Sequence, residues 1–167
     1  MKGNHMRKKL GPLWVVLLVL IDQITKYWAR TDLRVNGPID VIEGVFSFEY
    51  LENRGIAFGL FQGKFNIFIV LTIIILAGIV FFYYRLPDER RYRPLQFCMI
   101  FIAAGAIGNM IDRVMLNYVV DFLYFNLINF PIFNVADCYV TVSEIILPIL
   151  LLFYYKEEEL QFYKRGK

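Results

Sequence analysis

Two residue types on which many enzymes depend are scarce in this chain of 167 residues. It has one histidine, His5, and two cysteines, Cys98 and Cys138, each inside an apolar run. Two isolated cysteines give neither a disulfide framework nor a paired metal-binding motif, and we interpret both as small buried apolar side chains. His5 lies in MKGNHM, residues 1–6, which we interpret as a remnant outside the fold. Zinc chemistry and a nucleophile activated by histidine are therefore excluded.

The chain also lacks the amino-acid composition of a typical soluble protein. The chain is 58% hydrophobic and 17% aromatic, with a mean hydropathy of +0.51. These values are typical of a polytopic membrane protein. The net charge of +3 does not indicate a nucleic-acid partner, because the basic residues lie at the ends of apolar segments rather than on one polar face. We expect a single membrane-embedded domain, residues 1–167, and no nucleic-acid partner.

Four apolar segments are long enough to cross a bilayer as helices. They lie at about 10–28, 65–84, 95–116 and 135–155. At a rise of about 1.5 Å per residue, each covers a hydrocarbon core of about 30 Å. The first segment carries Asp22 and Lys26 and lacks a small-residue cleavage site, so we expect a true span rather than a signal peptide. The predicted fold class is an all-α polytopic membrane protein with four transmembrane helices.

Lysine and arginine are unevenly distributed among the segments that link these helices. Twelve of the eighteen basic residues lie in the N-terminal tail, the link RLPDERRYRP and the C-terminal tail. Because positively charged links stay in the cytoplasm, both termini are predicted to be cytoplasmic. The stretch 117–134 has no lysine or arginine and is predicted to lie outside, together with 29–64.

The outer link between the first two helices has the pattern of a β-strand. In GVFSFEYLENRGIAFGLF, Phe46, Phe48 and Tyr50 alternate with Ser47 and Glu49. This alternation predicts a small extracytoplasmic β-sheet at about 39–61. Its aromatic face would suit the membrane interface, where such side chains concentrate.

Polar residues share one face of the third helix and one face of the first. Asn109 and Asp112 follow two glycines at helical spacing, and the glycines allow a neighbouring helix to approach closely. These polar residues could form a purely structural clamp, with Asp112 paired to a basic group and Asn109 bonded to the backbone. Asp22 and Lys26, four residues apart, are expected to form a salt bridge. The glycines are Gly105 and Gly108.

Two carboxylates have no cation between them in the sequence. Asp121 follows the third span in NYVVDF, and Asp137 begins the fourth in FPIFNVADCYVTV. Two nearby carboxylates tend to share a proton, so one can act as a base on water while the other polarises a carbonyl, as in aspartic proteases. The alternative is that Asp137 caps the fourth helix and Asp121 caps a short surface helix. Asn134 lies where it could orient Asp137 or cap the helix itself.

Five motifs along nearly the whole chain resemble a known family, the bacterial lipoprotein signal peptidases, also called type II signal peptidases. They are DQITK (22–26), ENRGIAFG (52–59), GAIGNMIDR (105–113), VVDF (119–122) and FNVAD (133–137). The resemblance implies a four-helix inner-membrane aspartic endopeptidase. It would remove the signal peptide from diacylglyceryl-modified prolipoproteins by cutting before the lipidated cysteine of the lipobox. It implies no metal and no organic cofactor.

The resemblance also assigns residues to the site. The catalytic aspartates would be Asp121 and Asp137, and the outer sheet would correspond to the β-cradle of the family. Cys138 departs from the small hydroxyl residue expected there, and Glu144 from an apolar or small residue. The supporting residues carried over are Asp22, Lys26, Asn53, Gly55, Asn109, Asp112, Arg113, Asn134 and Ala136.

Two other functions and one other nucleophile are alternatives to the aspartic protease. A proton-coupled transporter needs acidic groups near the midplane, where only Glu144 lies. A non-enzymatic scaffold for membrane peptides would tolerate Asp121→Asn. A Ser–Lys nucleophile would need Ser47 and Lys64 to meet, which no pattern indicates. We expect the protease to act on prolipoproteins as a monomer surrounded by membrane lipids. It would lie in the bacterial cytoplasmic membrane with its active site at the extracytoplasmic face.

Overall fold

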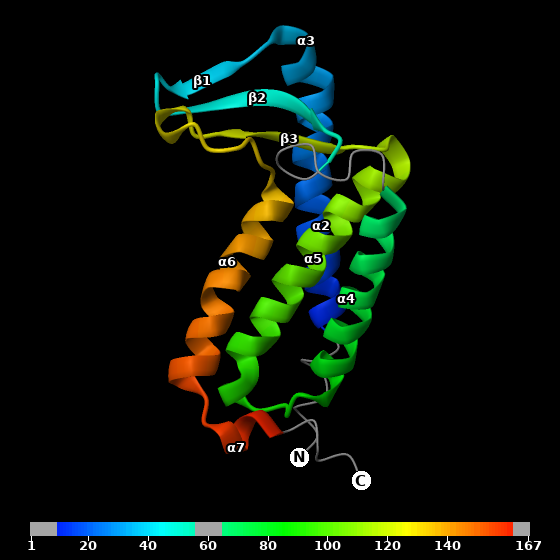
Figure 1. The fold of residues 1–167 in the computed structure, drawn as a ribbon, viewed down its shortest axis with the longest axis vertical. Helices are drawn as coiled ribbons and strands as arrows, with labels where there is room; N and C mark the ends of the chain where they lie inside the picture. Colours follow the sequence, from blue (N-terminus) through cyan, green and yellow to red (C-terminus); the bar gives the residue numbers. More distant parts are fainter. Residues whose placement is uncertain (1–9, 56–64, 162–167) are drawn as a thin grey trace.

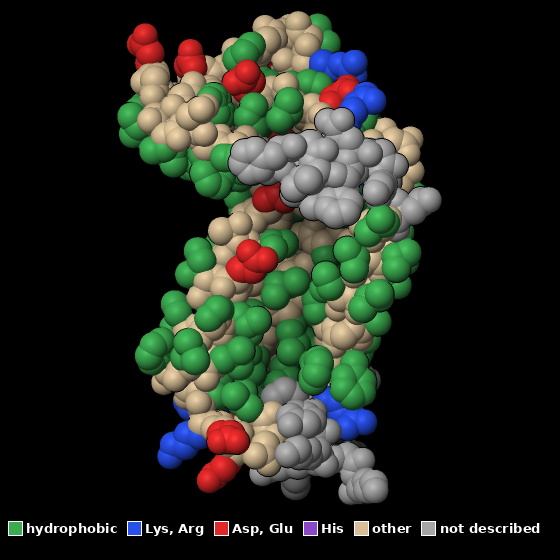
Figure 2. Space-filling model, viewed as in Figure 1, with side chains coloured by type: hydrophobic (Ala, Val, Ile, Leu, Met, Phe, Trp, Pro, Cys, Tyr) green, Lys and Arg blue, Asp and Glu red, His purple; other side chains and the backbone are tan. Residues whose placement is uncertain are grey.

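The computed structural model describes residues 10–55 and 65–161. Within these residues, four helices are long and apolar enough to cross a membrane, which confirms the predicted architecture: Gly11–Asn36, Ile67–Arg85, Arg90–Leu116 and Val135–Tyr154. Figure 1 shows the helices running along the long axis, with a small sheet at one end. On the face drawn in Figure 2, hydrophobic side chains cover much of the helices, and most of the charged side chains lie at the two ends.

The first span is longer than its apolar pattern. Helix α2 (Gly11–Trp28) continues through a π-helical stretch (Ala29–Leu33) into α3 (Arg34–Asn36). The helix ends at Gly37, whose φ of +89° favours glycine. The sequence predicted an end near residue 28 because charged residues begin there. Hydropathy shows where the apolar stretch ends, whereas the helix itself continues into the polar residues that follow.

The other spans follow the predicted ranges closely. Helix α4 (Phe65–Arg85) is followed by a 3-10 turn (Arg90–Tyr92) and α5 (Arg93–Leu116). The C-cap of α5 is Asn117, in the left-handed conformation, which turns the chain toward the sheet. Helix α6 (Val135–Ile149) passes into a π-helical stretch (Leu150–Tyr154) just after Pro148, and a short α7 (Glu157–Leu160) follows.

The sheet has three antiparallel strands in the order β1-β2-β3. β1 (Ile39–Ile42) and β2 (Phe46–Asn53) lie in the predicted β region, of which 56–61 falls outside the described residues. β3 (Val119–Tyr124) was not predicted and comes from the link between α5 and α6. β2 and β3 pair so that Leu51 lies opposite Asp121. The predicted surface helix capped by Asp121 is therefore wrong, because this residue is in a strand.

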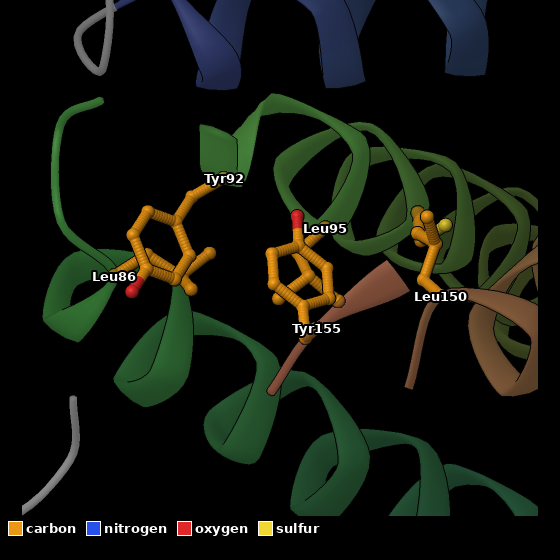
Figure 3. Close-up of a cluster of buried hydrophobic side chains, with 6 residues drawn as sticks. Leu86, Tyr92, Leu95, Leu150 and Tyr155 are labelled. Atoms are coloured by element: carbon orange, nitrogen blue, oxygen red, sulfur yellow. The ribbon is translucent and has the colours of Figure 1, made fainter. Parts of the chain in front are cut away.

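Two clusters fix the ends of the helices. Near the sheet, the aromatic face of β2 packs on the first span, with the rings of Trp28 and Phe48 edge to face at 5.3 Å. At the opposite end, Figure 3 shows buried side chains from the α4–α5 link, α5 and the end of the fourth span. There Tyr92 stacks on Tyr155 at 5.7 Å, and Cys98 is fully buried as predicted. The sheet is thus held firmly over one end of the four helices.

Candidate active site

Helix α5 approaches its neighbours as closely as glycine permits. A Cβ added to Gly105 would lie 2.5 Å from the backbone oxygen of Ala136 on α6. A Cβ on Gly108 would lie 2.5 Å from Oδ2 of Asp22 on α2. The predicted close helix contact at these glycines is confirmed. It brings the start of α6, the outer part of α2 and the middle of α5 together.

A buried lysine connects the first span to the third. Lys26 is 2% exposed, and its Nζ lies 2.9 Å from Oδ2 of Asp22 and 3.3 Å from Oδ2 of Asp112. The same Nζ donates to Oδ1 of Asn109 at 2.9 Å. The predicted Asp22–Lys26 salt bridge is confirmed, and Asp112 has the basic partner that the structural clamp required. Two carboxylates and an amide compensate the buried cation, as a buried charge requires.

Asn109 connects Lys26 to Asp137 by hydrogen bonds. Its Nδ2 donates to Oδ1 of Asp137 at 2.8 Å, while its Oδ1 accepts from Lys26 and from Nδ2 of Asn134. The prediction that Asn109 bonds to the backbone is wrong, since its side chain bonds to other side chains. The lysine orients the amide, because the Asn109 oxygen must face Nζ and the amide NH₂ must then face the carboxylate.

Asn134 contacts both aspartates. It is the N-cap of α6: its Oδ1 accepts from the backbone N–H of Asp137 at 3.0 Å, and its own N–H donates to Oδ2 of Asp137 at 3.1 Å. Its Nδ2 donates to Oδ1 of Asp121 at 2.6 Å. Both predicted roles of Asn134, capping the helix and orienting Asp137, are confirmed. The same capping box means that Asp137 does cap α6, as the alternative interpretation expected.

Asp121 is 1% exposed and lies on β3. Nδ2 of Asn53, on β2, donates to its Oδ2 at 2.8 Å, and the N–H of Gly55 donates to Oδ1 of Asn53. Burial first, and then the negative charge of Asp137, raise the pKa of Asp121 to about 7, against the opposing effect of its two amide donors. Asp121 therefore carries a proton through much of the range below neutral pH.

Most of the chain is similar to known proteins. It matches the family model described as Signal peptidase (SPase) II over residues 14–153. The chain belongs to this family. The lipoprotein signal peptidase of Clostridium novyi (strain NT) is 40% identical to it over 84% of this chain and 95% of that protein. The lipoprotein signal peptidase of Streptococcus thermophilus (strain CNRZ 1066) is also 40% identical, over 92% of this chain and 97% of that protein. A bacterial membrane enzyme solved by the in meso method superposes with a TM-score of 0.77, at 35% identity over 89% of this chain and 93% of that one.

Family membership confirms the resemblance carried by the five motifs. It makes the chain a signal peptidase II, a multi-pass bacterial membrane peptidase that removes signal peptides from prolipoproteins.

In this signal peptidase II, the cations near the two aspartates come from elsewhere in the chain. The sequence contains no lysine or arginine between Asp121 and Asp137, but Lys26 acts on Asp121 from the first span. Arg113 interacts electrostatically with both aspartates, donates to the backbone oxygen of Asn109 at 3.3 Å and lies 5.2 Å from the ring of Phe68. The absence of a basic residue between the two aspartates in the sequence therefore does not leave the pair without cations in the fold.

Two contacts in the site were missed by sequence reasoning. Asp112 accepts from the backbone N–H of Val120 at 3.0 Å, which ties β3 to α5 one residue before Asp121. Gln23, inside the DQITK motif, donates to Oδ1 of Asp112 at 3.1 Å. The motif itself was the signal that could have identified Gln23.

Other groups weighed from the sequence lie apart from this network. The hydroxyl of Ser47 donates to Asn126 at 2.9 Å, and Lys64, its proposed dyad partner, lies outside the described residues. Among residues 10–55 and 65–161, no three His, Cys, Asp or Glu side chains gather closely enough to hold a metal ion. Among the described residues, the polar groups of the site are therefore carboxylates, amides and the two cations of Lys26 and Arg113.

Proposed function

We propose that this signal peptidase II is an aspartic endopeptidase whose catalytic pair is Asp121 and Asp137. The observation that carries this proposal is that one residue, Asn134, hydrogen-bonds to both carboxyl groups: its backbone N–H donates to Asp137, and its side-chain Nδ2 donates to Asp121. The pKa of Asp121, raised to about 7, suits a proton donor at neutral pH. Asp137, held by Asn109 and by the backbone of Asn134, would then be the base.

The proposed reaction needs only these two groups and one water. Asp137 removes a proton from the water, and the oxygen attacks the scissile carbonyl carbon. Asp121 gives its proton to the carbonyl oxygen, which stabilises the tetrahedral intermediate. The intermediate then collapses: the C–N bond breaks, the amine leaves with the proton held by Asp137, and Asp121 regains its own proton. The products are a signal peptide with a new carboxyl end and a lipoprotein with a new amino end.

The remaining polar residues hold this pair in position. Lys26 fixes the amide of Asn109, and Asp112 fixes the backbone of β3. Asp22 accepts from the backbone N–H of Ala136, which anchors the start of α6 beside Asp137. We assign these side chains, with Asn53 and Arg113, to positioning. Gly55, through its N–H, orients Asn53.

The proposed substrate is a prolipoprotein whose lipobox cysteine carries diacylglycerol, cut before that cysteine. Asp121 and Asp137 lie where α6 begins and the sheet meets the helices, which suits a bond at the outer interface. The acyl chains would stay among the membrane lipids and supply about 0.8 kcal/mol per buried CH₂. The signal helix would lie alongside the four spans. We propose that the protein works as a monomer without metal or organic cofactor.

Cleavage of a diacylglyceryl-modified prolipoprotein by the purified protein tests this proposal. Asp137→Asn keeps an oxygen that accepts the Asn134 N–H, so the cap of α6 survives while the base is lost. Asp121→Asn likewise removes the proton donor. We expect each variant to fold, with a lower unfolding temperature because the new amide NH₂ replaces one oxygen that accepts a hydrogen bond, and to lose about 10²- to 10⁴-fold in kcat.

The matched control is Glu43→Gln, in the exposed turn between β1 and β2, which should keep parent activity. Near-parent cleavage by either aspartate variant would show that the carboxyl group concerned is structural. Cleavage on the other side of the lipidated cysteine would contradict the proposed bond.

A further inference from the structure

One acidic side chain within the fourth span takes no part in the polar network. Glu144 is exposed on the surface of α6 and forms no hydrogen bond or ion pair with the residues that the structure describes. A carboxyl group that faces hydrocarbon without a partner is costly, and such residues are commonly functional.

Glu144 lies on the same face of α6 as Asp137. Seven residues make almost two full helical turns, so the two side chains differ by only about 20° around the helix axis. The same seven residues place Glu144 about 10.5 Å farther along the helix, toward the opposite end of the span. A peptide that descends from Asp137 along this face of α6 would therefore pass Glu144.

The backbone of α6 also loses one helical hydrogen bond at this place. Pro148, four residues after Glu144, has no N–H, so the backbone oxygen of Glu144 lacks its α-helical hydrogen bond. Thr141, one turn nearer to Asp137, is exposed, and its hydroxyl also has no partner among the described residues. By contrast, the hydroxyls of Thr25 and Thr31 bond back to their own helix. Glu144 is thus the centre of a polar stripe that offers unused acceptors to the membrane.

We propose that Glu144 determines specificity by binding a hydrogen-bond donor in the signal peptide: the side chain of Ser, Thr, Asn or Gln. This inference rests on the proposed function, because it takes Asp137 as the position of the cleaved bond. A span of 10.5 Å corresponds to seven residues of helix, or to about three residues of extended chain. The donor side chain therefore lies three to seven residues before the cleaved bond.

A substrate series tests this with the full-length protein in detergent. The reference is a diacylglyceryl-modified prolipoprotein with Leu at positions three to seven before the bond. Five others each carry one Gln in that window. For the parent, we expect one Gln substrate to be favoured about three- to tenfold in kcat/KM, as interhelical hydrogen bonds in membranes are worth. Glu144→Leu should abolish that preference, and Glu144→Gln should keep it because its amide oxygen still accepts.

Ile149→Leu is the control, since Ile149 is exposed on α6 and lies about 140° around the helix axis from Glu144, and it should keep the preference. A parent that shows no preference overturns the inference, and so does a preference that survives Glu144→Leu. If Glu144→Leu lowers kcat/KM equally for all substrates, the inference is also overturned, because an equal loss would mean that Glu144 has a structural role. Cleavage of the all-Leu reference supports the proposed function independently, whereas a parent that cuts nothing removes both proposals.

Discussion

At the scale of single residues, the environment of Asp121 is set by two opposing influences. Burial and the charge of Asp137 favour its neutral form, while the amides of Asn53 and Asn134 and the charge of Lys26 favour its ionised form. The first pair prevails, so the pKa of Asp121 rises to about 7. Asp121 therefore holds its proton below about pH 7, as its proposed role as a proton donor requires.

This balance makes the pH dependence of cleavage predictable. Because Asp121 must hold its proton, kcat/KM should fall as the pH rises through about 7, by about tenfold per pH unit above it. Asn53→Ala removes a donor that favours the ionised form. The pKa of Asp121 then rises further, and the falling limb should move to higher pH. A pH–rate profile of both proteins measures this shift, and a limb that moves to lower pH would contradict the assigned role.

The residues of the site were largely predictable, and their contacts were not. Asp121 and Asp137 could be singled out because each is an acidic residue at a membrane boundary without a basic residue nearby in sequence. Lys26 and Arg113 come from other helices, so local sequence could not show that they act on the aspartates. The bond from Asn109 to Asp137 depends on the distance between α5 and α6, which no spacing along the chain specifies.

At the scale of elements, membrane helices were easier to predict than the strand that carries Asp121. A span has a hydrophobic length set by the bilayer, so its range can be read from the sequence. β3 begins with four consecutive buried residues rather than with an alternation, because both of its faces are covered. A short run of this kind cannot be told from the end of a helix by periodicity. Its pairing with β2 is a long-range contact that only the fold reveals.

The contact between α5 and α6 gives a prediction at this scale. In Gly105→Ala the added methyl group would meet the backbone oxygen of Ala136, which cannot move without shifting α6. We expect overpacking to lower the stability by about 1–3 kcal/mol. It should also reduce cleavage, because the shift separates Asn109 from Asp137. Thermal unfolding in detergent and the cleavage assay measure the two effects.

Gly78→Ala on α4 is the matched control for that substitution. A Cβ at Gly78 meets nothing within 4 Å, and alanine favours helix by about 1 kcal/mol over glycine. This variant should therefore unfold at or above the parent temperature. A Gly105→Ala protein as stable and as active as Gly78→Ala would mean that the α5–α6 contact can relax without cost.

At the scale of the whole molecule, charge and architecture agree on one orientation in the membrane. The sheet and the two aspartates lie at one end of the helices, and the basic link after α4 lies at the other (Figure 1). Because basic links remain in the cytoplasm, the sheet end should face outward. The proposed catalytic pair would then lie on the outer side of the membrane.

Labelling of single cysteines in intact cells tests this orientation. In a background with Cys98→Ala and Cys138→Ala, we would introduce Glu43→Cys at the sheet end or Glu89→Cys in the α4–α5 link, both at exposed positions. A membrane-impermeant maleimide should label Glu43→Cys in intact cells and Glu89→Cys only after the membrane is permeabilised. The opposite pattern would place Asp121 and Asp137 in the cytoplasm, where a signal peptidase could not meet a translocated substrate. Equal labelling of both before permeabilisation would mean that the cells leak, so a cytoplasmic cysteine protein must stay unlabelled in the same experiment.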